Sequence, residues 1–312
     1  MPAHRCGHGQ PGLTAMRLGL QLPSFTFPGG AATIRSTLTE IGQAAEDAGL
    51  ASLWVMDHGF QLPEGSGWGG PDEPMLEAYT TLGFLAQATT RIALGPLVAG
   101  VIYREPGALI KTATTLDVLS GGRTYLGLGA GWYEREAHGL GFPYPPRTER
   151  FERLEETLRI AHRMFAGDRA AIDGAHYQLA EPINVPAPLS RPRPRIMVGG
   201  NGPRRTMGLV ARYADACNIL VPDPGESRRL VDTIARLCEA AGRDPAEVEK
   251  TSLLEADLRP GRRPSDLVEA IRGQAQEGIE HVIVNLPEAY RVEQITALGR
   301  EVLPEIAGLR AA

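Results

Sequence analysis

Short apolar runs rich in β-branched residues alternate along the chain with longer segments in which apolar residues recur every three or four positions. The short runs are typical of buried strands, and the longer segments are typical of amphipathic helices. The predicted strands cover residues 17–22, 52–56, 92–98, 124–128, 195–198, 216–221, 249–258 and 281–285. The predicted helices cover residues 33–48, 78–88, 106–119, 149–165, 203–213, 226–241, 264–277 and 292–306.

Strand–helix units in an unbroken series of eight predict an α/β fold, the closed parallel (β/α)8 or TIM barrel. The alternative, a doubly wound open sheet, usually carries GxGxxG directly after its first strand, where this chain has Pro-Ser-Phe-Thr at 23–26. No shift in composition divides the chain, so residues 16–312 are predicted to form a single domain. An irregular, proline-rich insertion at 167–194, with a hairpin expected at Asp173-Gly174, separates the fourth helix from the fifth strand.

The composition narrows the class of protein further. Hydrophobic residues make up 43% of the chain and charged residues 22%, and the net charge of −5 argues against nucleic acid or an anionic membrane as the main partner. Cys6, Cys217 and Cys238 show no CxxC spacing, which favours a reduced, cytoplasmic setting. Residues 1–15 lack the apolar core of a secretory signal and are predicted to form a disordered N-terminal extension.

The first candidate for chemistry follows the second predicted strand. Barrel enzymes keep their active sites at the C-terminal ends of the strands, and Asp57-His58 stands directly at such an end. A histidine there can exchange a proton near neutral pH, and an adjacent carboxylate can orient it. Glu136, in the loop after the fourth strand, is a candidate acid. The alternative is that Asp57 caps a loop and His58 only packs.

The run Gly127–Trp132 ends the fourth strand and is the second candidate. Glycines expose the backbone, so a flat ring or a phosphate can approach Gly129 and Ala130 closely; the alternative is a tight loop that simply needs glycine. Three aromatic side chains near the strand ends are predicted to wall in a substrate: Phe25, Trp132 and Tyr133.

A glycine-rich turn after the fifth strand is the third candidate. It opens into a helix, whose free N–H groups and dipole make an anion site, and Arg204 and Arg205 are predicted to add charge-assisted contacts. The alternative is an ordinary glycine-rich connection. The chain has neither an HExxH nor a GxSxG motif, so no metal site and no serine nucleophile are predicted.

Seven stretches, in this order, resemble the luciferase-like oxidoreductase family, and closely its deazaflavin (coenzyme F420) branch. They run from the first strand through the sixth. They are residues 16–23 (MRLGLQLP), 53–58 (LWVMDH), 92–98 (IALGPLV), 103–106 (YREP), 116–123 (LDVLSGGR), 127–132 (GLGAGW) and 213–218 (YADACN).

The resemblance implies a (β/α)8 barrel with the cofactor ring at the end of the third strand. It also implies a bulge with a non-proline cis peptide, here at Leu97-Val98, and a phosphate seat in the turn after the fifth strand. Asp57 would lie near the ring, and His58 would position the substrate or relay a proton. The residues predicted to contact the cofactor are Asp57, Leu97, Val98, Gly100, Gly129, Ala130, Val198, Gly199, Gly200, Asn201 and Gly202.

Two departures from the family pattern restrict the expected activity. Some deazaflavin-dependent sugar-phosphate dehydrogenases carry a catalytic glutamate directly after the glycine run of the fourth strand, where this chain has Trp132, which argues against that activity. Just past the bulge, those relatives carry a small hydroxyl residue where this chain has Ala99-Gly100. The contact of that hydroxyl with the cofactor ring is therefore not expected here.

The resulting hypothesis is an F420-dependent oxidoreductase that transfers a hydride between C5 of the deazaflavin and a small organic substrate, in the direction of reducing an activated C=C or C=N bond. The site would then mainly align two rings and exclude water. One alternative is an FMN-dependent monooxygenase that uses reduced flavin and oxygen. Another is a barrel that binds a cofactor or ligand without catalysis. By resemblance, we also expect a homodimer.

Overall fold

The computed structural model describes residues 15–220 and 225–312. The predicted N-terminal extension, Ala15 excepted, therefore lies outside the described residues. Ala15 forms an antiparallel bridge with Arg310, so the start of the first strand lies beside the end of the described chain. No helix in the described ranges is long and apolar enough to cross a membrane.

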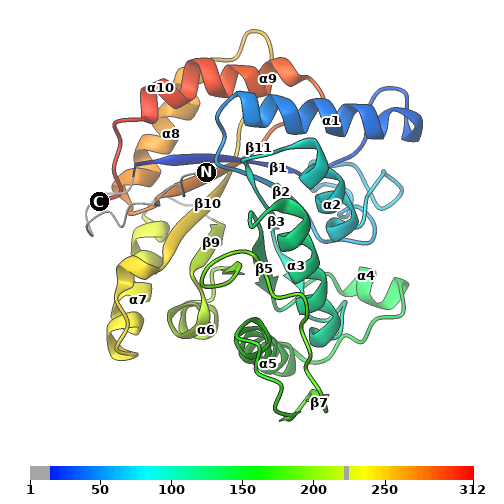
Figure 1. Cartoon of the computed structure of the whole chain (residues 1–312). Helices are drawn as coiled ribbons and strands as arrows, with labels where there is room; N and C mark the ends of the chain where they lie inside the picture. Colours follow the sequence, from blue (N-terminus) through cyan, green and yellow to red (C-terminus); the bar gives the residue numbers. More distant parts are fainter. Residues whose placement is uncertain (1–14, 221–224) are drawn as a thin grey trace, which may run out of the picture.

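A ring of parallel strands forms the centre of the molecule (Figure 1). The sheet has nine strands in the order β3-β2-β1-β11-β10-β9-β8-β5-β4. The Leu94 N–H donates to the Arg123 carbonyl at 2.9 Å and closes the ring between β3 and β5. The predicted closed barrel is therefore confirmed. The strands are β1 (Arg17–Leu22), β2 (Ser52–Val55), β3 (Ala93–Pro96), β4 (Ala99–Gly100), β5 (Tyr125–Gly129), β8 (Arg195–Gly199), β9 (Ala216–Leu220), β10 (Glu249–Glu255) and β11 (His281–Asn285).

The third predicted strand, 92–98, is broken in two. β3 and β4 are separated by a cis peptide between Leu97 and Val98, at the position that the family resemblance implied. The Gln21 side chain donates to the Leu97 carbonyl at 3.1 Å and fixes the break from inside the barrel. Before the break β3 pairs with β2, and beyond it β4 pairs with β5, so both parts of the strand belong to the ring.

Helices surround the ring, with α1, α9 and α10 along one side and α5 on the opposite side (Figure 1). They agree with the predicted helices to within a few residues, apart from α4 and the C-terminal helix. The helices are α1 (Ala31–Asp47), α2 (Ala78–Ala88), α3 (Pro106–Ser120), α4 (Glu134–Gly139), α5 (Arg147–Phe165), α6 (Arg205–Tyr213), α7 (Glu226–Ala240), α8 (Pro264–Gln276), α9 (Val292–Ala297) and α10 (Leu303–Ile306).

The exceptions have local causes. The helix predicted over 292–306 contains a π-helical turn at Leu298–Val302, between α9 and α10. Pro304 cannot donate a backbone hydrogen bond and its ring crowds the preceding turn, so the helix widens there. Helix α4 lies in the loop after the fourth predicted strand, where no helix was predicted. Glu134 and Glu136 in its first turn suit the positive end of a helix dipole.

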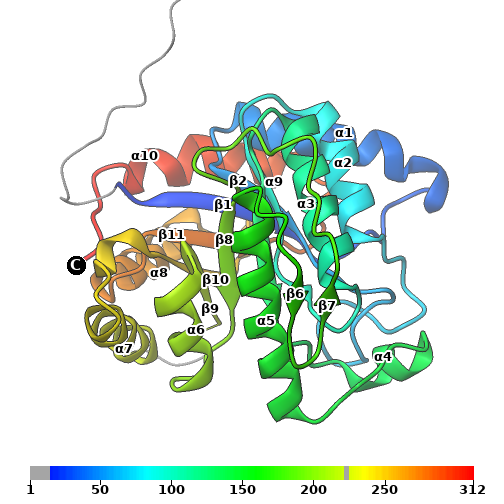
Figure 2. The same cartoon turned by 60° about the horizontal axis from the view of Figure 1, so that its bottom comes forward.

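The predicted hairpin in the insertion is confirmed as β6 (Ile172–Asp173) paired antiparallel with β7 (Gln178–Leu179). Figure 2 shows it running beside α5. The Glu156 carboxylate of α5 accepts hydrogen bonds from three consecutive backbone N–H groups, 175–177, at 2.8–3.3 Å. This buried acid fastens the hairpin of the insertion to α5.

A polar cluster, which we call the floor cluster, closes the N-terminal end of the barrel. It comprises Ser52, Trp54, Tyr125, Glu249 and His281. His281 Nδ1 contacts Glu249 at 2.8 Å, its Nε2 contacts Ser52 at 2.9 Å, and the Trp54 indole donates to Ser52 at 2.6 Å. Tyr125 donates to Glu249 at 3.0 Å. The buried polar groups in this end are thus paired with one another, as burial requires.

Candidate active site

The opposite, C-terminal end of the strands opens into a cavity of about 500 Å³. It brings together residues that follow β2, β4, β5 and β8, as the rule for barrel enzymes predicts. The lining residues that the sequence predicted are Asp57, His58, Leu97, Val98, Gly100, Gly129, Ala130, Trp132, Gly199, Gly200, Asn201 and Gly202. Those it did not predict include Tyr103, Tyr144, Arg147, Arg150, Phe151, Thr206, Asn218, Leu220 and Leu253.

Some predicted residues lie elsewhere. Phe25 is fully buried and packs edge-on against Phe27, with ring centroids 6.2 Å apart, so its assignment to the wall of the cavity is wrong. The chain turns inward after β1 instead of following the rim. Val198 is also fully buried, within β8. Tyr133 is buried behind Trp132, its ring stacked on the indole at 5.1 Å.

Glu136 is fully buried and lies behind the cavity wall, in contact with His58. Its carboxylate accepts hydrogen bonds from His58 Nδ1 at 2.9 Å, from the Tyr103 hydroxyl and from the Gly59 N–H. Burial by itself would raise the pKa of Glu136, but these three donors outweigh it and hold the pKa below its usual value. The carboxylate therefore stays ionised and directs the Nδ1 proton of His58 toward itself.

Tyr103 lines the cavity and donates to the same Glu136 carboxylate. Burial, followed by its hydrogen bond to Glu136, raises the pKa of the Tyr103 phenol well above its usual value, so the hydroxyl remains a donor. The same ring also lines a smaller cavity of about 180 Å³ behind it, together with Phe142 and Arg153. Tyr103 is thus the wall between two hollows.

Asp57 forms a two-pronged ion pair with Arg104, at 2.7 and 2.8 Å, and also accepts the Gly100 N–H at 3.2 Å. Arg104 in turn contacts Glu77 at 2.5 Å. Desolvation would lower the pKa of Arg104, but these carboxylates raise it, so the guanidinium stays charged. Asp57 therefore presents a neutralised, fixed carboxylate to the cavity and anchors the backbone just past the cis peptide.

Val98 protrudes between two glycines. A Cβ on Gly129 would lie 2.8 Å from Val98, and one on Gly199 would lie 2.9 Å from it, closer than carbon atoms approach without displacement. Only glycine at both positions lets the two strands close on this side chain. The result is an apolar platform in the middle of the cavity floor.

The turn after β8 is held by its own polar atoms. The Gly200 N–H donates to the Asn218 carbonyl at 3.0 Å, with φ +122°, a backbone angle that favours glycine. Asn201 accepts the Leu220 N–H at 2.8 Å. Gly202 packs against Thr206 in the first turn of α6. The turn and the start of the helix thereby face the same cavity.

Arg204 and Arg205 do not join this turn. They line a separate depression with Thr148 and Phe151, and Arg205 stands 5.7 Å above the Phe151 ring. Neither arginine lines the cavity that contains the glycine turn. The helix begins at Arg205 rather than at Pro203, so Arg204 precedes its first turn.

Arginines do reach the cavity, but from α5. Arg147 and Arg150 lie one turn apart at the start of this helix and both line the hollow. The spacing of three residues would have placed them on one helical face, but the helix was predicted to begin only at residue 149. No other feature of the sequence indicates that this face turns toward the cavity.

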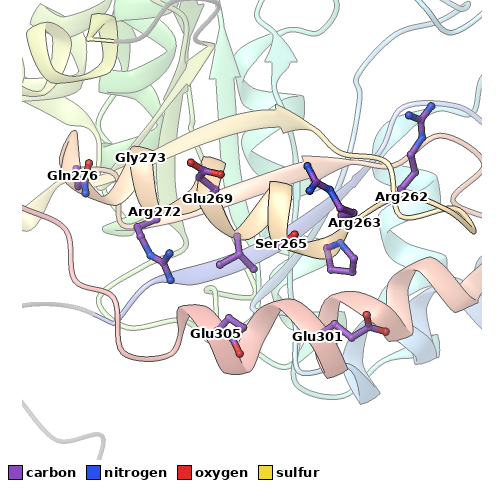
Figure 3. Close-up of a pocket in the computed structure, with 11 residues that line it drawn as sticks. Arg262, Arg263, Ser265, Glu269, Arg272, Gly273, Gln276, Glu301 and Glu305 are labelled. Carbon is purple, nitrogen blue, oxygen red and sulfur yellow. The ribbon is translucent and has the colours of Figure 1, made fainter.

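Another depression lies outside the barrel, between α8 and the C-terminal helical segment (Figure 3). Its lining charges include Arg263, Arg272, Glu269 and Glu305, and none of the predicted site residues is among them. It shares no lining residue with the cavity at the strand ends. Within the described ranges no group of three or more acidic, histidine or cysteine side chains is arranged to hold a metal ion.

The model of the luciferase-like monooxygenase family matches residues 16–282. The chain belongs to this family. The match spans most of the barrel and confirms the resemblance found in the sequence.

Relatives within the family are named as F420-dependent enzymes. The F420-dependent glucose-6-phosphate dehydrogenase of Kineococcus radiotolerans is 29% identical over 272 residues, which cover 85% of this chain and 73% of the relative. The F420-dependent hydroxymycolic acid dehydrogenase of Mycobacterium tuberculosis is 28% identical over 259 residues, covering 82% and 69%. The family and these relatives confirm that the chain is an oxidoreductase enzyme.

Solved structures share the fold. The F420-dependent tetrahydromethanopterin reductase of Methanopyrus kandleri superimposes with a TM-score of 0.77 at 16% identity, covering 94% of this chain and 99% of that one. The oxygenating constituent of 3,6-diketocamphane monooxygenase of Pseudomonas putida, in complex with FMN, gives 0.73 at 16% identity, with the same coverage. At these identities the likeness shows the barrel and nothing finer.

Proposed function

We propose that this protein is an F420-dependent oxidoreductase that transfers a hydride between C5 of the deazaflavin and a small organic substrate, reducing an activated C=C or C=N bond. The observation that carries the proposal is the single cavity that joins a flat apolar platform, a glycine turn at a helix N-terminus and a carboxylate-oriented histidine. The names of the relatives support F420 as the cofactor.

The residues present fit a tricyclic ring with a phosphorylated side chain. The ring would lie on the Val98 side chain, on which Gly129 and Gly199 close, and the phosphate would take the backbone N–H groups of Asn201 and Gly202. When bound, F420 supplies a carrier of two electrons as hydride that reacts poorly with oxygen.

His58 is the proposed proton donor. Its Nδ1 is committed to Glu136, so Nε2 is the nitrogen left to exchange a proton with a ligand. Hydride addition to one carbon of a polarised double bond leaves negative charge on its neighbour, and a proton delivered from Nε2 neutralises it. Tyr103 and Glu136 hold the His58 imidazole in this orientation, and Asp57 serves as a fixed contact near the cofactor.

The substrate would lie over the platform against Trp132, whose surface is 58% exposed. A sugar phosphate is not the proposed substrate, because Trp132 occupies the position at which those dehydrogenases of the family carry their glutamate. An unsaturated, ring-containing compound suits the aromatic wall better, since an indole face offers dispersion contacts and no charge.

The second candidate is an FMN-dependent monooxygenase. It is favoured by the shared barrel of the FMN-bound monooxygenase from Pseudomonas putida and by the same glycine turn, which would accept either phosphate. A third candidate, a barrel that binds a ligand without catalysis, would give the pairing of His58 with Glu136 no function.

We further propose a cytoplasmic homodimer in which residues 16–312 form one domain. Sedimentation would test the dimer, and limited proteolysis would test the single domain.

Anaerobic titration of the purified protein with F420 and with FMN, followed by fluorescence, separates these candidates. The proposal expects micromolar or tighter binding of F420 and weaker binding of FMN. Tight binding of FMN with none of F420 would refute it in favour of the monooxygenase. For a substrate found by screening reduced F420 oxidation, a His58→Ala variant with unchanged turnover would remove His58 from the mechanism. Oxidation of reduced F420 by none of the screened compounds would favour the non-catalytic barrel.

A further inference from the structure

The end of the cavity at α5 carries uncompensated positive charge. Arg147 and Arg150 line it, and neither has a carboxylate within 4 Å among the described residues. The next arginine of the helix, Arg153, pairs with Glu149 at 2.8 Å, as surface arginines of this chain commonly do. Asp57, which also lines the cavity, is already neutralised by Arg104. This local charge contrasts with the net charge of −5 for the whole chain.

Contacts within the protein fix the Arg150 side chain beside the cavity. Its guanidinium lies 4.3 Å above the Tyr144 ring and one Nη donates to the Gly131 carbonyl. Its Nε is buried without a hydrogen-bond partner. A carboxylate bound in the cavity, which Arg150 lines, would accept from the other Nη of this guanidinium. Because stacking already fixes the side chain, little conformational freedom is lost on binding.

The two arginines lie near the glycine turn and away from His58. Arg147, Arg150 and Gly202 line the same cavity, and Arg147 stands 5.9 Å from the ring of Phe151, which lines it as well. In the other direction, Trp132 separates the arginines from His58: its ring lies 5.8 Å from the imidazole, and its carbonyl accepts from Tyr144 at 2.9 Å. The positive charge therefore adjoins the proposed phosphate seat.

We propose that Arg147 and Arg150 bind the carboxylates that F420 carries on its side chain beyond the phosphate. This inference rests on the proposed function. A guanidinium matches a carboxylate with two parallel hydrogen bonds, and two arginines exceed what one phosphate already seated on backbone N–H groups requires. FMN ends at its phosphate, so the arginine pair gives the cavity a preference for the longer, more acidic cofactor.

The test compares two ligands that differ only in the tail. One is F420 with its lactyl-oligoglutamyl chain; the other is the 5′-phosphate of the same deazaflavin chromophore, which lacks that chain. Their dissociation constants are measured by fluorescence titration for the wild type, Arg147→Gln, Arg150→Gln and the double variant. Arg159→Gln is the matched control, because this arginine is on the same helix, 56% exposed and outside the cavity.

Each substitution is expected to weaken F420 binding about tenfold, since a charge-assisted hydrogen bond is lost. The affinity for the phosphorylated chromophore should stay within about twofold, and Arg159→Gln should change neither. An equal loss for both ligands would overturn the inference, because the arginines would then serve the phosphate. Unchanged affinity for F420 in the double variant would also overturn it. A wild type that binds neither deazaflavin would instead refute the proposed function itself.

Discussion

Lowering the pH should destabilise the protein through His281 in the floor cluster. The imidazole is 1% exposed and contacts Glu249 and Ser52, while Arg17 and Arg195 both pair with the same glutamate. Burial, followed by repulsion from the two arginines, holds the pKa of His281 well below its usual value. The folded protein therefore keeps the ring neutral at a pH where the unfolded chain protonates it.

The size of the effect follows from proton linkage. An unfolded histidine titrates near pH 6.5, so stability is complete above about pH 7.5 and falls as the pH decreases. Between about pH 7.5 and pH 5.5 the unfolded chain takes up nearly one proton at this site. That uptake lowers the free energy of unfolding by about 1.4 kcal/mol. His162, whose pKa is also lowered, first by burial, adds a loss of the same sign.

Urea unfolding at a series of pH values isolates the contribution of His281. In His281→Asn the side-chain amide still donates to Glu249. This variant should be less stable than the wild type at every pH, but between about pH 7.5 and pH 5.5 its free energy of unfolding should fall by about 1.4 kcal/mol less. His138→Asn, which changes an exposed ring, should run parallel to the wild type. Parallel curves for wild type and His281→Asn would refute the reasoning, because the folded protein would then bind the proton as readily as the unfolded chain.

Three further substitutions test the site. Asp57→Asn should lower the free energy of unfolding by about 3 kcal/mol in urea, because it leaves the Arg104 guanidinium half-buried without its two-pronged partner. Gly199→Ala should displace Val98 and weaken cofactor binding at least about tenfold in fluorescence titration, with unchanged circular dichroism. Trp132→Ala should change the free energy of unfolding by less than about 1 kcal/mol, because the indole is largely exposed, while raising KM for an aromatic substrate.

Sequence periodicity was sufficient for the barrel but not for every partner in the site. Strand ends converge at one rim in any parallel barrel, so Asp57, His58 and the glycine turns could be grouped from their positions alone. The contact between His58 and Glu136 spans 78 residues and depends on how α4 folds back over the mouth, which no local pattern encodes. Phe25 was misplaced for the same reason, because a loop's direction is set by packing rather than by its own residues.

The positions of Arg147 and Arg150 show a second limit. Helix α5 begins at Arg147, two residues before its predicted start at residue 149. The prediction therefore did not show that Arg147 and Arg150 share the helix face toward the cavity. Helix ends are the least regular part of a helix, since their terminal backbone groups lack partners within it. Functional residues placed in a first turn are therefore the ones most easily overlooked from periodicity.

Tyr103 couples two properties that an enzyme usually varies separately. Its ring divides the main cavity from the smaller one behind it, and its hydroxyl donates to the carboxylate that orients His58. A smaller residue at this position would join the two cavities and admit longer molecules. It would also remove the hydrogen bond to Glu136 and so leave the His58 imidazole less firmly oriented. Divergence toward bulkier substrates in this lineage would thus require a compensating donor elsewhere, so substrate length and proton handling would have to evolve together.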